Sequence, residues 1–512
     1  MVDIIPFKAL KFNVTTNEEI SKLVSPPYDI ITSQQKEELK TYSKNNIVRL
    51  ILPDDSDNNL NIDKYELAKN ILNTWLNDNI LTIDNEEAFY VFEVDFLNNE
   101  HQNDWKNFTS FIGLTKIEEY ESAKVLRHEY TLSKPKEDRL NLLKSTNTNF
   151  GLIYTLYDDN KNEIQIILDK YKKQKPIFDF IPKYNNKLKF KIWKITNIED
   201  INKIINLMKD KNILIADGHH RYETSRLFKH EINKKRQLIN NENYKTSFVN
   251  ALQRYILPED YVLTMYVNFN QENIKILPIH RLIKLEEKLD IKDFLKNLSK
   301  YFDILNYFDI FQFNFNNTND DSTNFQKLDS IKINELNKTN INIISENINN
   351  FMQKNKKDGK KCFCIIIKSL QNNNDFNGKN IKNISKNLDF TFNIFFLILN
   401  KKINDIYIDF DENDLEFEKL DVQILHKLII ENYLNKYIIK NLDYSHSTFE
   451  ALNDLFYNPN NNYNNYDLAI IVNPTEIKEV QNLALKGRVM PQKSTYFYPK
   501  PCSGLVMYKM DL

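Results

Sequence analysis

Short apolar runs and segments of helical periodicity alternate along nearly the whole chain. Residues 88–96 alternate apolar and polar positions as a half-buried strand does, and residues 108–116 are the predicted hairpin neighbour of that strand. In residues 65–79, apolar side chains recur at the spacing of one helix face. This succession of strands and helices predicts an α/β or α+β fold, with mixed sheets and flanking helices.

Turn and capping residues define further elements. In SPPYDII, residues 25–31, two prolines exclude a helix and hold Tyr28 and Asp29 on a stiff loop. A helix that ends near residue 44 can then begin at a cap formed by Thr32 or Ser33. The remaining apolar runs predict strands at residues 47–52, 151–157, 247–252, 261–268, 362–368 and 468–473.

The stretch ILIADGHHRYETS, residues 213–225, concentrates more polar chemistry than any other part of the chain. Residues 213–216 predict a short buried strand, Asp217-Gly218 ends it, and a long segment of helical character follows. A helix that begins at such a turn offers unpaired N–H groups and the positive end of its dipole. Both attract anions.

The residue types at this turn favour anion binding with an acid or base nearby. The chain has only 7 glycines in 512 residues, so Gly218 indicates a backbone position that other residues cannot occupy. His219 and His220 can move protons near neutral pH, and Arg221 offers a planar fork for phosphate or carboxylate. The alternative is a polar loop in which Asp217 caps the helix and the histidines are solvated.

A second polar cluster extends over residues 125–157, from a predicted strand end into a predicted helix. Its candidate phosphate ligands are Arg127, His128, Lys136 and Arg139. Glu129 could act as a base or as a metal ligand. The alternative is a charged, solvated helix start.

Two shorter motifs repeat this chemistry. ILPIHRLI, residues 276–283, places His280 and Arg281 after an apolar segment and a proline. Near the C-terminus, Lys493 lies between a proline and aromatic residues, where it could face an anion. The alternatives are a histidine satisfied within the core and an exposed lysine beside a proline-broken strand pair.

The length of 512 residues is enough for several domains at the usual size of about 150 residues each. We expect an N-terminal α/β part at 1–110, a core with both polar clusters at 111–300, and a C-terminal α/β part at 301–512, which could form one continuous body. Three stretches rich in asparagine are interpreted as loop insertions: 316–350, 371–386 and 457–466.

Charge and cysteine content narrow the class of protein. The chain has 69 Lys and Arg against 70 Asp and Glu, so no overall basic field attracts nucleic acid or an anionic membrane. Its three cysteines are too few for a disulfide framework and indicate reduced thiols. No secretory signal is evident, and the longest apolar run is far shorter than the roughly 20 residues that span a bilayer. We therefore expect a cytoplasmic protein.

Five motifs carry a resemblance to a known family over nearly the full length. SPPYDII, RHEYTLSKPKEDR, IADGHHRYET, ILPIHRLI and MPQKSTYFYPKPCSGLV occur in the same order as in the domain of unknown function 1015 family, often labelled ParB-like. The DGHHR box itself resembles the phosphate-binding box of the ParB/sulfiredoxin-like superfamily. That superfamily includes CTP-using ParB switches, sulfiredoxin, and kinases that phosphorylate free serine.

The resemblance implies a ParB/sulfiredoxin-like core with large insertions. By position it implies phosphate contacts from Gly218, His219, His220 and Arg221, with Asp217 orienting a histidine or a metal ion. A histidine stands where sulfiredoxin has its catalytic cysteine, so the sulfiredoxin reaction is not implied. No helix-turn-helix of the ParB kind is evident, and DNA partitioning is not implied either.

Two functions fit these motifs. The first is phosphoryl transfer or phosphate-ester hydrolysis on a small molecule, by analogy serine or phosphoserine, with ATP or ADP and Mg²⁺ as candidate cofactors. The second is a nucleotide-binding switch or adaptor without turnover. In the first function, Arg221, Arg139 and Arg281 would bind the phosphate oxygens. His219 or His220 would act as the acid, the base or the nucleophile. Glu129 or Asp29 would be the alternative base.

Overall fold

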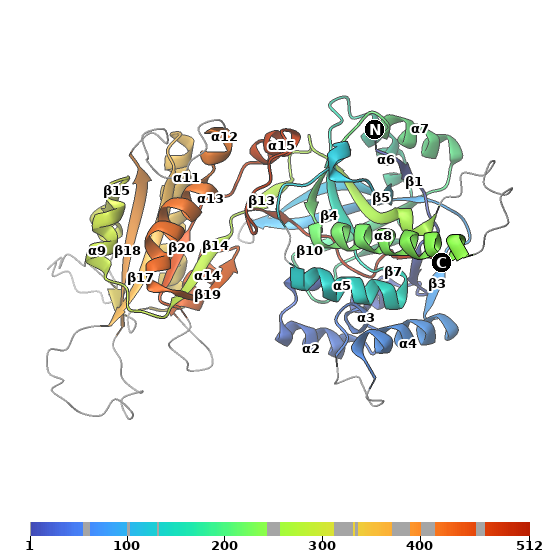
Figure 1. Cartoon of the computed structure of the whole chain (residues 1–512), viewed down its shortest axis with the longest axis horizontal. Helices are drawn as coiled ribbons and strands as arrows, with labels where there is room; N and C mark the ends of the chain where they lie inside the picture. Colours follow the sequence, from blue (N-terminus) through green and yellow to red (C-terminus); the bar gives the residue numbers. More distant parts are fainter. Residues whose placement is uncertain are drawn as a thin grey trace. The chain divides into compact units, whose positions relative to one another are not determined.

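The computed structural model describes residues 2–54, 62–99, 103–130, 133–242, 257–311, 331–332, 336–370, 390–400, 415–456 and 466–511. The chain forms two compact units (Figure 1). Unit 1 comprises Met1–Lys275, Gln481–Gln492 and Phe497–Leu512, and unit 2 comprises Ile276–Val480 and Lys493–Tyr496. Both are mixtures of helices and sheets, which confirms the predicted fold class.

A nine-stranded mixed sheet organises the described part of unit 1. Its order is β6 (Val125–Leu126), β11 (Ile213–Asp217), β8 (Ile153–Tyr157), β12 (Tyr261–Asn268), β5 (Asp104–Lys116), β4 (Phe89–Asn99), β10 (Leu188–Ile195) and β9 (Phe178–Phe180), with β1 (Ile4–Ile5) beside β5. The predicted hairpin is confirmed, because β4 and β5 pair antiparallel. The strand that precedes the DGHHR box is antiparallel to β8 and parallel to β6.

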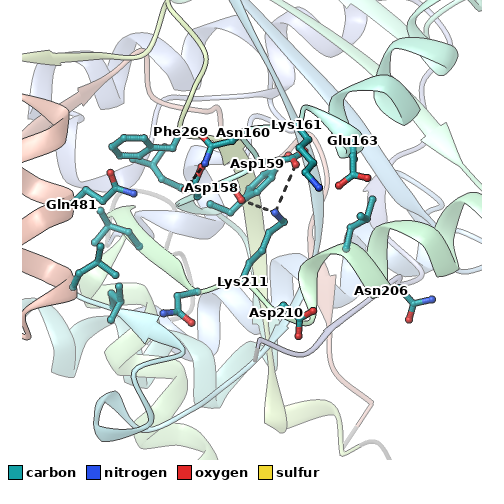
Figure 2. A pocket seen from close by; sticks show the side chains of 17 residues that line it. Asp158, Asp159, Asn160, Lys161, Glu163, Asn206, Asp210, Lys211, Phe269 and Gln481 are labelled. Atoms are coloured by element: carbon teal, nitrogen blue, oxygen red, sulfur yellow. Dashed lines mark hydrogen bonds and ion pairs between the residues drawn. The ribbon is translucent and has the colours of Figure 1, made fainter.

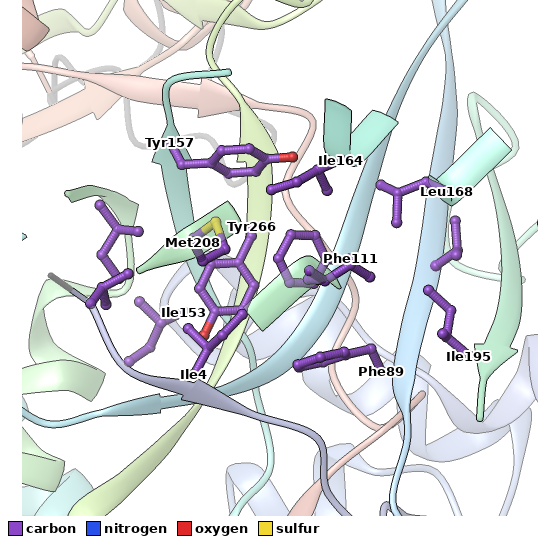
Figure 3. Close-up of a cluster of buried hydrophobic side chains, with 14 of the residues drawn as sticks. Ile4, Phe89, Phe111, Ile153, Tyr157, Ile164, Leu168, Ile195, Met208 and Tyr266 are labelled. Atoms are coloured by element: carbon purple, nitrogen blue, oxygen red, sulfur yellow. The ribbon is translucent and has the colours of Figure 1, made fainter. Parts of the chain in front are cut away.

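The core of unit 1 fills the space between this sheet and two helices, α6 (Glu163–Lys172) and α7 (Ile198–Met208) (Figure 3). Phe111 on β5 stacks on Tyr266 of β12, with ring centroids 4.6 Å apart. Ile164 and Leu168 of α6 and Met208 of α7 join the same cluster. Burial of these apolar side chains stabilises the sheet that carries β11.

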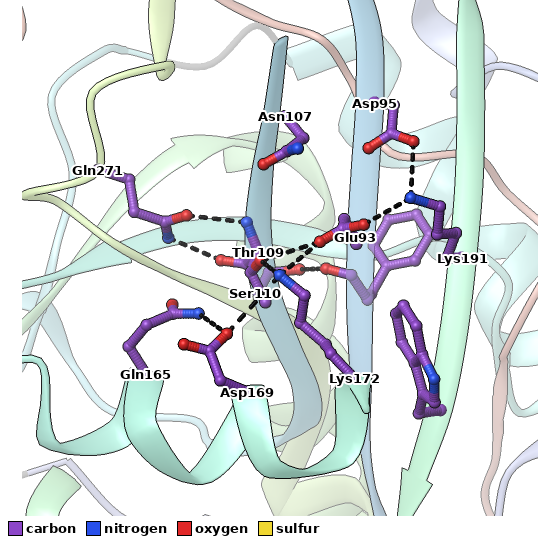
Figure 4. Close-up of polar contacts among 12 residues, drawn as sticks. Glu93, Asp95, Asn107, Thr109, Ser110, Gln165, Asp169, Lys172, Lys191 and Gln271 are labelled. Atoms are coloured by element: carbon purple, nitrogen blue, oxygen red, sulfur yellow. Dashed lines mark hydrogen bonds and ion pairs between the residues drawn. The ribbon is translucent and has the colours of Figure 1, made fainter. Parts of the chain in front are cut away.

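A buried carboxylate also ties the sheet to α6 (Figure 4). Glu93 on β4 is 5% exposed, and its two oxygens lie 2.5 Å from Lys172 Nζ and 2.8 Å from Lys191 Nζ. Burial raises the pKa of Glu93, but hydrogen bonds and charge from the two lysines outweigh it and hold the pKa below its usual range. The group is therefore an ionised link between strands and helix.

A layer of helices packs beside the helix that begins in the DGHHR box. Helix α5 (Ser133–Thr146) packs against α8 (His219–Glu242) and also against α4 (Lys64–Asn77). Helix α2 (Ser33–Tyr42) begins at the predicted cap, because the Thr32 hydroxyl accepts a hydrogen bond from Gln35 N at 3.2 Å. The predicted helices at 33–44 and 65–79 are thus confirmed.

The predicted strand at 47–52 is wrong, because Val48–Ile51 form helix α3. Asn46, fully buried, donates to the backbone oxygens of Lys22 and Val24, at 2.8 and 3.2 Å, and accepts from Val48 N at 2.9 Å. These contacts fix a helical turn. A fully buried apolar run suits either a helix or a strand, so its hydrophobicity did not distinguish them.

An antiparallel sheet forms the centre of unit 2. Its strands are β15 (Phe302–Asn306), β18 (Phe390–Leu399), β17 (Cys362–Leu370), β20 (Leu468–Ile471), β14 (His280–Leu285) and β19 (Ile439–Ser445), with β16 (Ile331–Lys332) beside β18. Successive residues of β17 enter two different apolar clusters, so both faces of this strand are covered. This explains its continuous apolar sequence.

The Asn-rich stretch at 316–350 is not all loop, because α11 (Lys338–Lys357) begins within it. Ile341, Ile344 and Ile348 recur on one face of α11 and are buried, which is why a segment rich in asparagine still forms a helix. Most of the other Asn-rich residues, and the predicted strand at 247–252, lie outside the described residues. Within the described ranges, none of the helices has the length and apolar character needed to cross a bilayer.

Candidate functional site

The DGHHR box lies at a strand, turn and helix start, as its sequence predicts. Strand β11 ends at Asp217, Gly218 has a φ of 96°, and α8 begins at His219. A Cβ atom at Gly218 would lie 3.1 Å from Arg221 Nε, in a backbone region that L residues rarely adopt. Glycine therefore lets the chain turn closely against Arg221. The first N–H groups of α8 and the positive end of its dipole therefore lie at this turn.

Asp217 orients two cations at this turn. Its Oδ2 atom accepts from Arg221 Nη2 at 2.5 Å, and its Oδ1 atom pairs with Lys500 Nζ. Lys500 Nζ also lies 3.8 Å from Asp29 Oδ2. Burial raises the pKa of Asp217, but the charges of Lys500 and Arg221 outweigh it and hold the pKa well below its usual range. The carboxylate is ionised and fixes both cations beside the helix start.

Lys500 was not singled out by sequence reasoning, which chose Lys493 from the same C-terminal motif. The sequence feature that could have pointed to Lys500 is its pair of flanking prolines, Pro499 and Pro501, which restrict the backbone on both sides. Lys500 is 8% exposed, whereas Lys493 is exposed. A buried lysine without a nearby carboxylate would be costly, so its pairing with Asp217 is what permits this position.

Two histidines of different motifs meet beside the turn. The ring centroids of His128 and His219 are 4.6 Å apart, and His128 Nδ1 lies 2.8 Å from the backbone oxygen of Ile215. His219 is 8% exposed, and its Nε2 atom has no hydrogen-bond partner among the described residues. Burial first, and then the neighbouring His128, lowers the pKa of His219 to about 3. His219 is therefore a neutral imidazole near pH 7, better suited to hydrogen bonding than to accepting a proton.

The other candidates of the first two clusters also belong to unit 1. Glu129 Oε1 lies 3.7 Å from His128 Nε2, at 15% side-chain exposure. The Arg127 guanidinium lies 4.5 Å from the Tyr120 ring centroid and pairs with Glu223 at 3.7 Å. His220 lies half-buried in the first turn of α8, and Lys136 lies half-buried in α5.

Arg139 joins this region from α5. Its Nη1 atom donates to the backbone oxygen of Ile51 at 2.6 Å, its Nε atom donates to Asp138 at 2.9 Å, and its guanidinium lies 4.2 Å from the Tyr28 ring centroid. Burial and the adjacent Asp29 raise the pKa of Tyr28 to about 12. The predicted stiff loop contains one 3₁₀ turn, Tyr28–Ile30. It places Tyr28 beside Arg139, and Asp29 Oδ2 3.8 Å from Lys500 Nζ.

His280, Arg281 and Lys493 belong to unit 2. Arg281 Nη2 donates to the backbone oxygen of Lys493 at 3.1 Å, so Lys493 takes part through its main chain. His280 Nε2 lies 3.2 Å from Thr448 Oγ1, and its Nδ1 accepts from Val472 N at 3.3 Å. Burial and the charge of Arg281 lower the pKa of His280 to about 3. The structure brings these three together within unit 2.

Among the described residues, no group of three or more His, Cys, Asp or Glu side chains lies close enough to hold a metal ion. The carboxylate of Asp217 is occupied by two cations. A metal-binding role for Asp217 stays a prediction.

Two of the cavities among the described residues of unit 1 lie near β11. The larger, of about 590 Å³, opens at the start of β11, where Lys211 Nζ donates to the backbone oxygen of Asp158 at 2.6 Å and lies 3.7 Å from Asp159 (Figure 2). None of the candidate site residues lines it. The smaller, of about 70 Å³, is lined by Arg221, Arg139 and Tyr28, among others. The motif residues Arg221, Arg139 and Tyr28 therefore line the smaller cavity, which lies at the other end of β11.

The family described as "Protein of unknown function (DUF1015)" matches residues 4–391. No curated protein matches the sequence. Among solved structures, a mutant of a free serine kinase in complex with ADP matches at 11% identity and a TM-score of 0.30, over 76% of this chain and 89% of that chain. A conserved hypothetical protein from Pyrococcus furiosus matches at 11% identity and a TM-score of 0.28, over 74% and 88%. Similarity at this level assigns no activity to this chain.

Proposed function

This chain belongs to the DUF1015 family, and from the geometry around Gly218 we propose that it is an enzyme of phosphoryl transfer or phosphate-ester hydrolysis on a small molecule. The observation that carries the proposal is the pair of cations, Arg221 and Lys500, held by one buried carboxylate at the start of α8. Helix N–H groups and fixed cations together form a site for a multiply charged anion.

The arrangement fits phosphoryl transfer because that chemistry needs positioning, neutralisation of negative charge and one base. Arg221 and Lys500 would contact phosphate oxygens, and the neutral imidazole of His219 would hydrogen-bond to one of them. Glu129, Asp29 or His220 would serve as the base. The resemblance of the DGHHR box to a phosphate-binding box supports the same anion.

The proposal is tested by incubating the purified chain with serine and ATP or ADP in the presence of Mg²⁺, and separately with O-phosphoserine, while following phosphorus NMR. Serine is the first substrate because the superfamily that the box resembles includes kinases of free serine. We expect net formation or loss of a phosphate ester. K500M should abolish it, whereas K144M should not, because Lys144 pairs with Glu231 on the surface of unit 1.

The second candidate is a nucleotide-binding switch without turnover, which the same helix-start geometry favours. Tight nucleotide binding that K500M weakens, with no turnover on any of these substrates, would favour the switch. Absence of binding by any phosphate compound would contradict both functions.

A further inference from the structure

The cavity beside Arg221 has a mainly apolar wall. Its volume is about 70 Å³. The apolar lining residues are Ile51, Leu142, Leu143, Phe150 and Val262. Arg221 lines it too, and its Nη2 atom donates to Asp217. A molecule whose anionic group contacts Arg221 could therefore place its remaining atoms in this cavity.

The volume limits what those atoms can be. A cavity of about 150 Å³ holds benzene, with its six heavy atoms. About half that volume accommodates roughly three heavy atoms by the same measure. A nucleobase, with about ten heavy atoms, is too large. The cavity fits a short chain instead.

Among the described residues that line the cavity, Thr224 has a fully buried side-chain oxygen without a hydrogen-bond partner. By contrast, Thr148 donates its hydroxyl to Thr146 O at 2.8 Å, and Asn149 Oδ1 accepts from Leu263 N at 3.1 Å. Thr224 is 2% exposed, and its Oγ1 atom makes no hydrogen bond within the described part of the chain. A buried hydroxyl without a partner is destabilising, which points to a ligand atom that completes it.

The charges around the cavity restrict the ligand further. Among the described residues, none that lines the cavity carries a carboxylate, so an ammonium group inside would be desolvated without compensation. Arg139 is bound to Asp138, and Arg221 is the contact proposed for the phosphate, so neither guanidinium is left for a second anionic group. The group in the cavity is therefore uncharged. Thr224 follows Arg221 by three residues on α8, so both side chains lie on one helix face.

We propose that this cavity holds the short, uncharged end of a phosphate monoester of about three carbon atoms, with Thr224 Oγ1 hydrogen-bonded to a hydroxyl at that end. The inference rests on the proposed function, because it places the phosphate at Arg221 and the start of α8. It names the compounds that this cavity accepts as esters of small uncharged alcohols, so the zwitterionic end of serine would lie outside the cavity.

Isothermal titration of the full chain with four probes tests this: inorganic phosphate, propyl phosphate, 3-hydroxypropyl phosphate and hexyl phosphate. We expect propyl phosphate to bind about tenfold or more tightly than inorganic phosphate, because apolar burial adds to the anion contact. Hexyl phosphate should bind more weakly than propyl phosphate, because it exceeds the cavity. The 3-hydroxypropyl ester should bind at least as tightly as the propyl ester.

Substitutions at Thr224 test the hydroxyl contact. T224V keeps the shape of the side chain without its hydroxyl, so it should bind the propyl ester more tightly than the 3-hydroxypropyl ester. T224S keeps a hydroxyl and should bind the 3-hydroxypropyl ester at least as tightly as the propyl ester, as the unaltered chain does. T146V is the matched control, because Thr146 lies outside the cavity wall and hydrogen-bonds to Leu142 O.

The outcomes separate this inference from the function on which it rests. Binding of inorganic phosphate with no gain from the propyl chain would overturn the cavity inference and leave the anion site standing. An unchanged order of the two esters in T224V would remove Thr224 from recognition. Binding of none of the four probes would overturn both proposals.

Discussion

Lys500 and Asp217 form an ion pair across 283 positions of sequence, with side-chain exposures of 7% and 12%. The pair connects the C-terminal motif to the DGHHR box within unit 1. Because Asp217 also binds Arg221, one carboxylate sets the positions of two cations from distant parts of the chain. The anion site proposed above is complete only when both segments are folded together.

Replacing Asp217 by Asn should destabilise unit 1, because it leaves two buried cations facing a neutral amide. We expect the free energy of unfolding to fall by roughly 3 to 5 kcal/mol. Urea unfolding followed by tryptophan fluorescence measures it, since all three tryptophans, Trp75, Trp105 and Trp193, lie in unit 1. D179N removes a half-exposed partner of Lys189 and should cost at most about 1 kcal/mol. Equal losses would contradict the prediction.

The depressed pKa of His219 should make stability depend on pH. Its pKa falls from 6.5 in the unfolded chain to about 3 when folded, so the stabilisation is complete above pH 6.5 and is lost as the pH falls toward 3. Protonation favours the unfolded chain in that range. H219N, which does not titrate there, should show a shallower decline in unfolding free energy between pH 6.5 and 4. Parallel curves for the two proteins would rule out this role.

Gly218→Ala should weaken phosphate binding as well as stability. The φ of 96° costs an alanine about 1 kcal/mol or more, and the new Cβ atom would press on Arg221 Nε at 3.1 Å. G487A is the matched control, because Gly487 has a φ of 71° but no atom within 4 Å of the added Cβ. G487A should therefore lose stability but keep its affinity for phosphate. Titration with inorganic phosphate distinguishes the two variants.

Glu93→Gln should destabilise unit 1 by about 3 kcal/mol, because it leaves the ammonium groups of Lys172 and Lys191 without their shared buried carboxylate. E86Q changes an exposed partner of Lys194 and should alter stability by less than about 1 kcal/mol. The same tryptophan-monitored urea titration compares them. A loss for E93Q no larger than that for E86Q would show that the carboxylate has no net stabilising role.

Local patterns in the sequence were enough to predict the elements whose determinants are local. The turn at Asp217-Gly218 follows from an apolar run that ends at a glycine, and α2 follows from its cap at Thr32. The run at 47–52 had no such marker. Its helix depends on Asn46, which bonds to backbone oxygens more than twenty residues away.

The sequence by itself determined the strand, turn and helix of the DGHHR box and the residue types available for binding an anion. Only the tertiary structure decided that Lys500, and not Lys493, meets Asp217. It also decided that His219 is neutral, because burial and the proximity of His128 set its pKa. Ion pairing and desolvation depend on distances between segments remote in sequence, and no local pattern of residues records those distances.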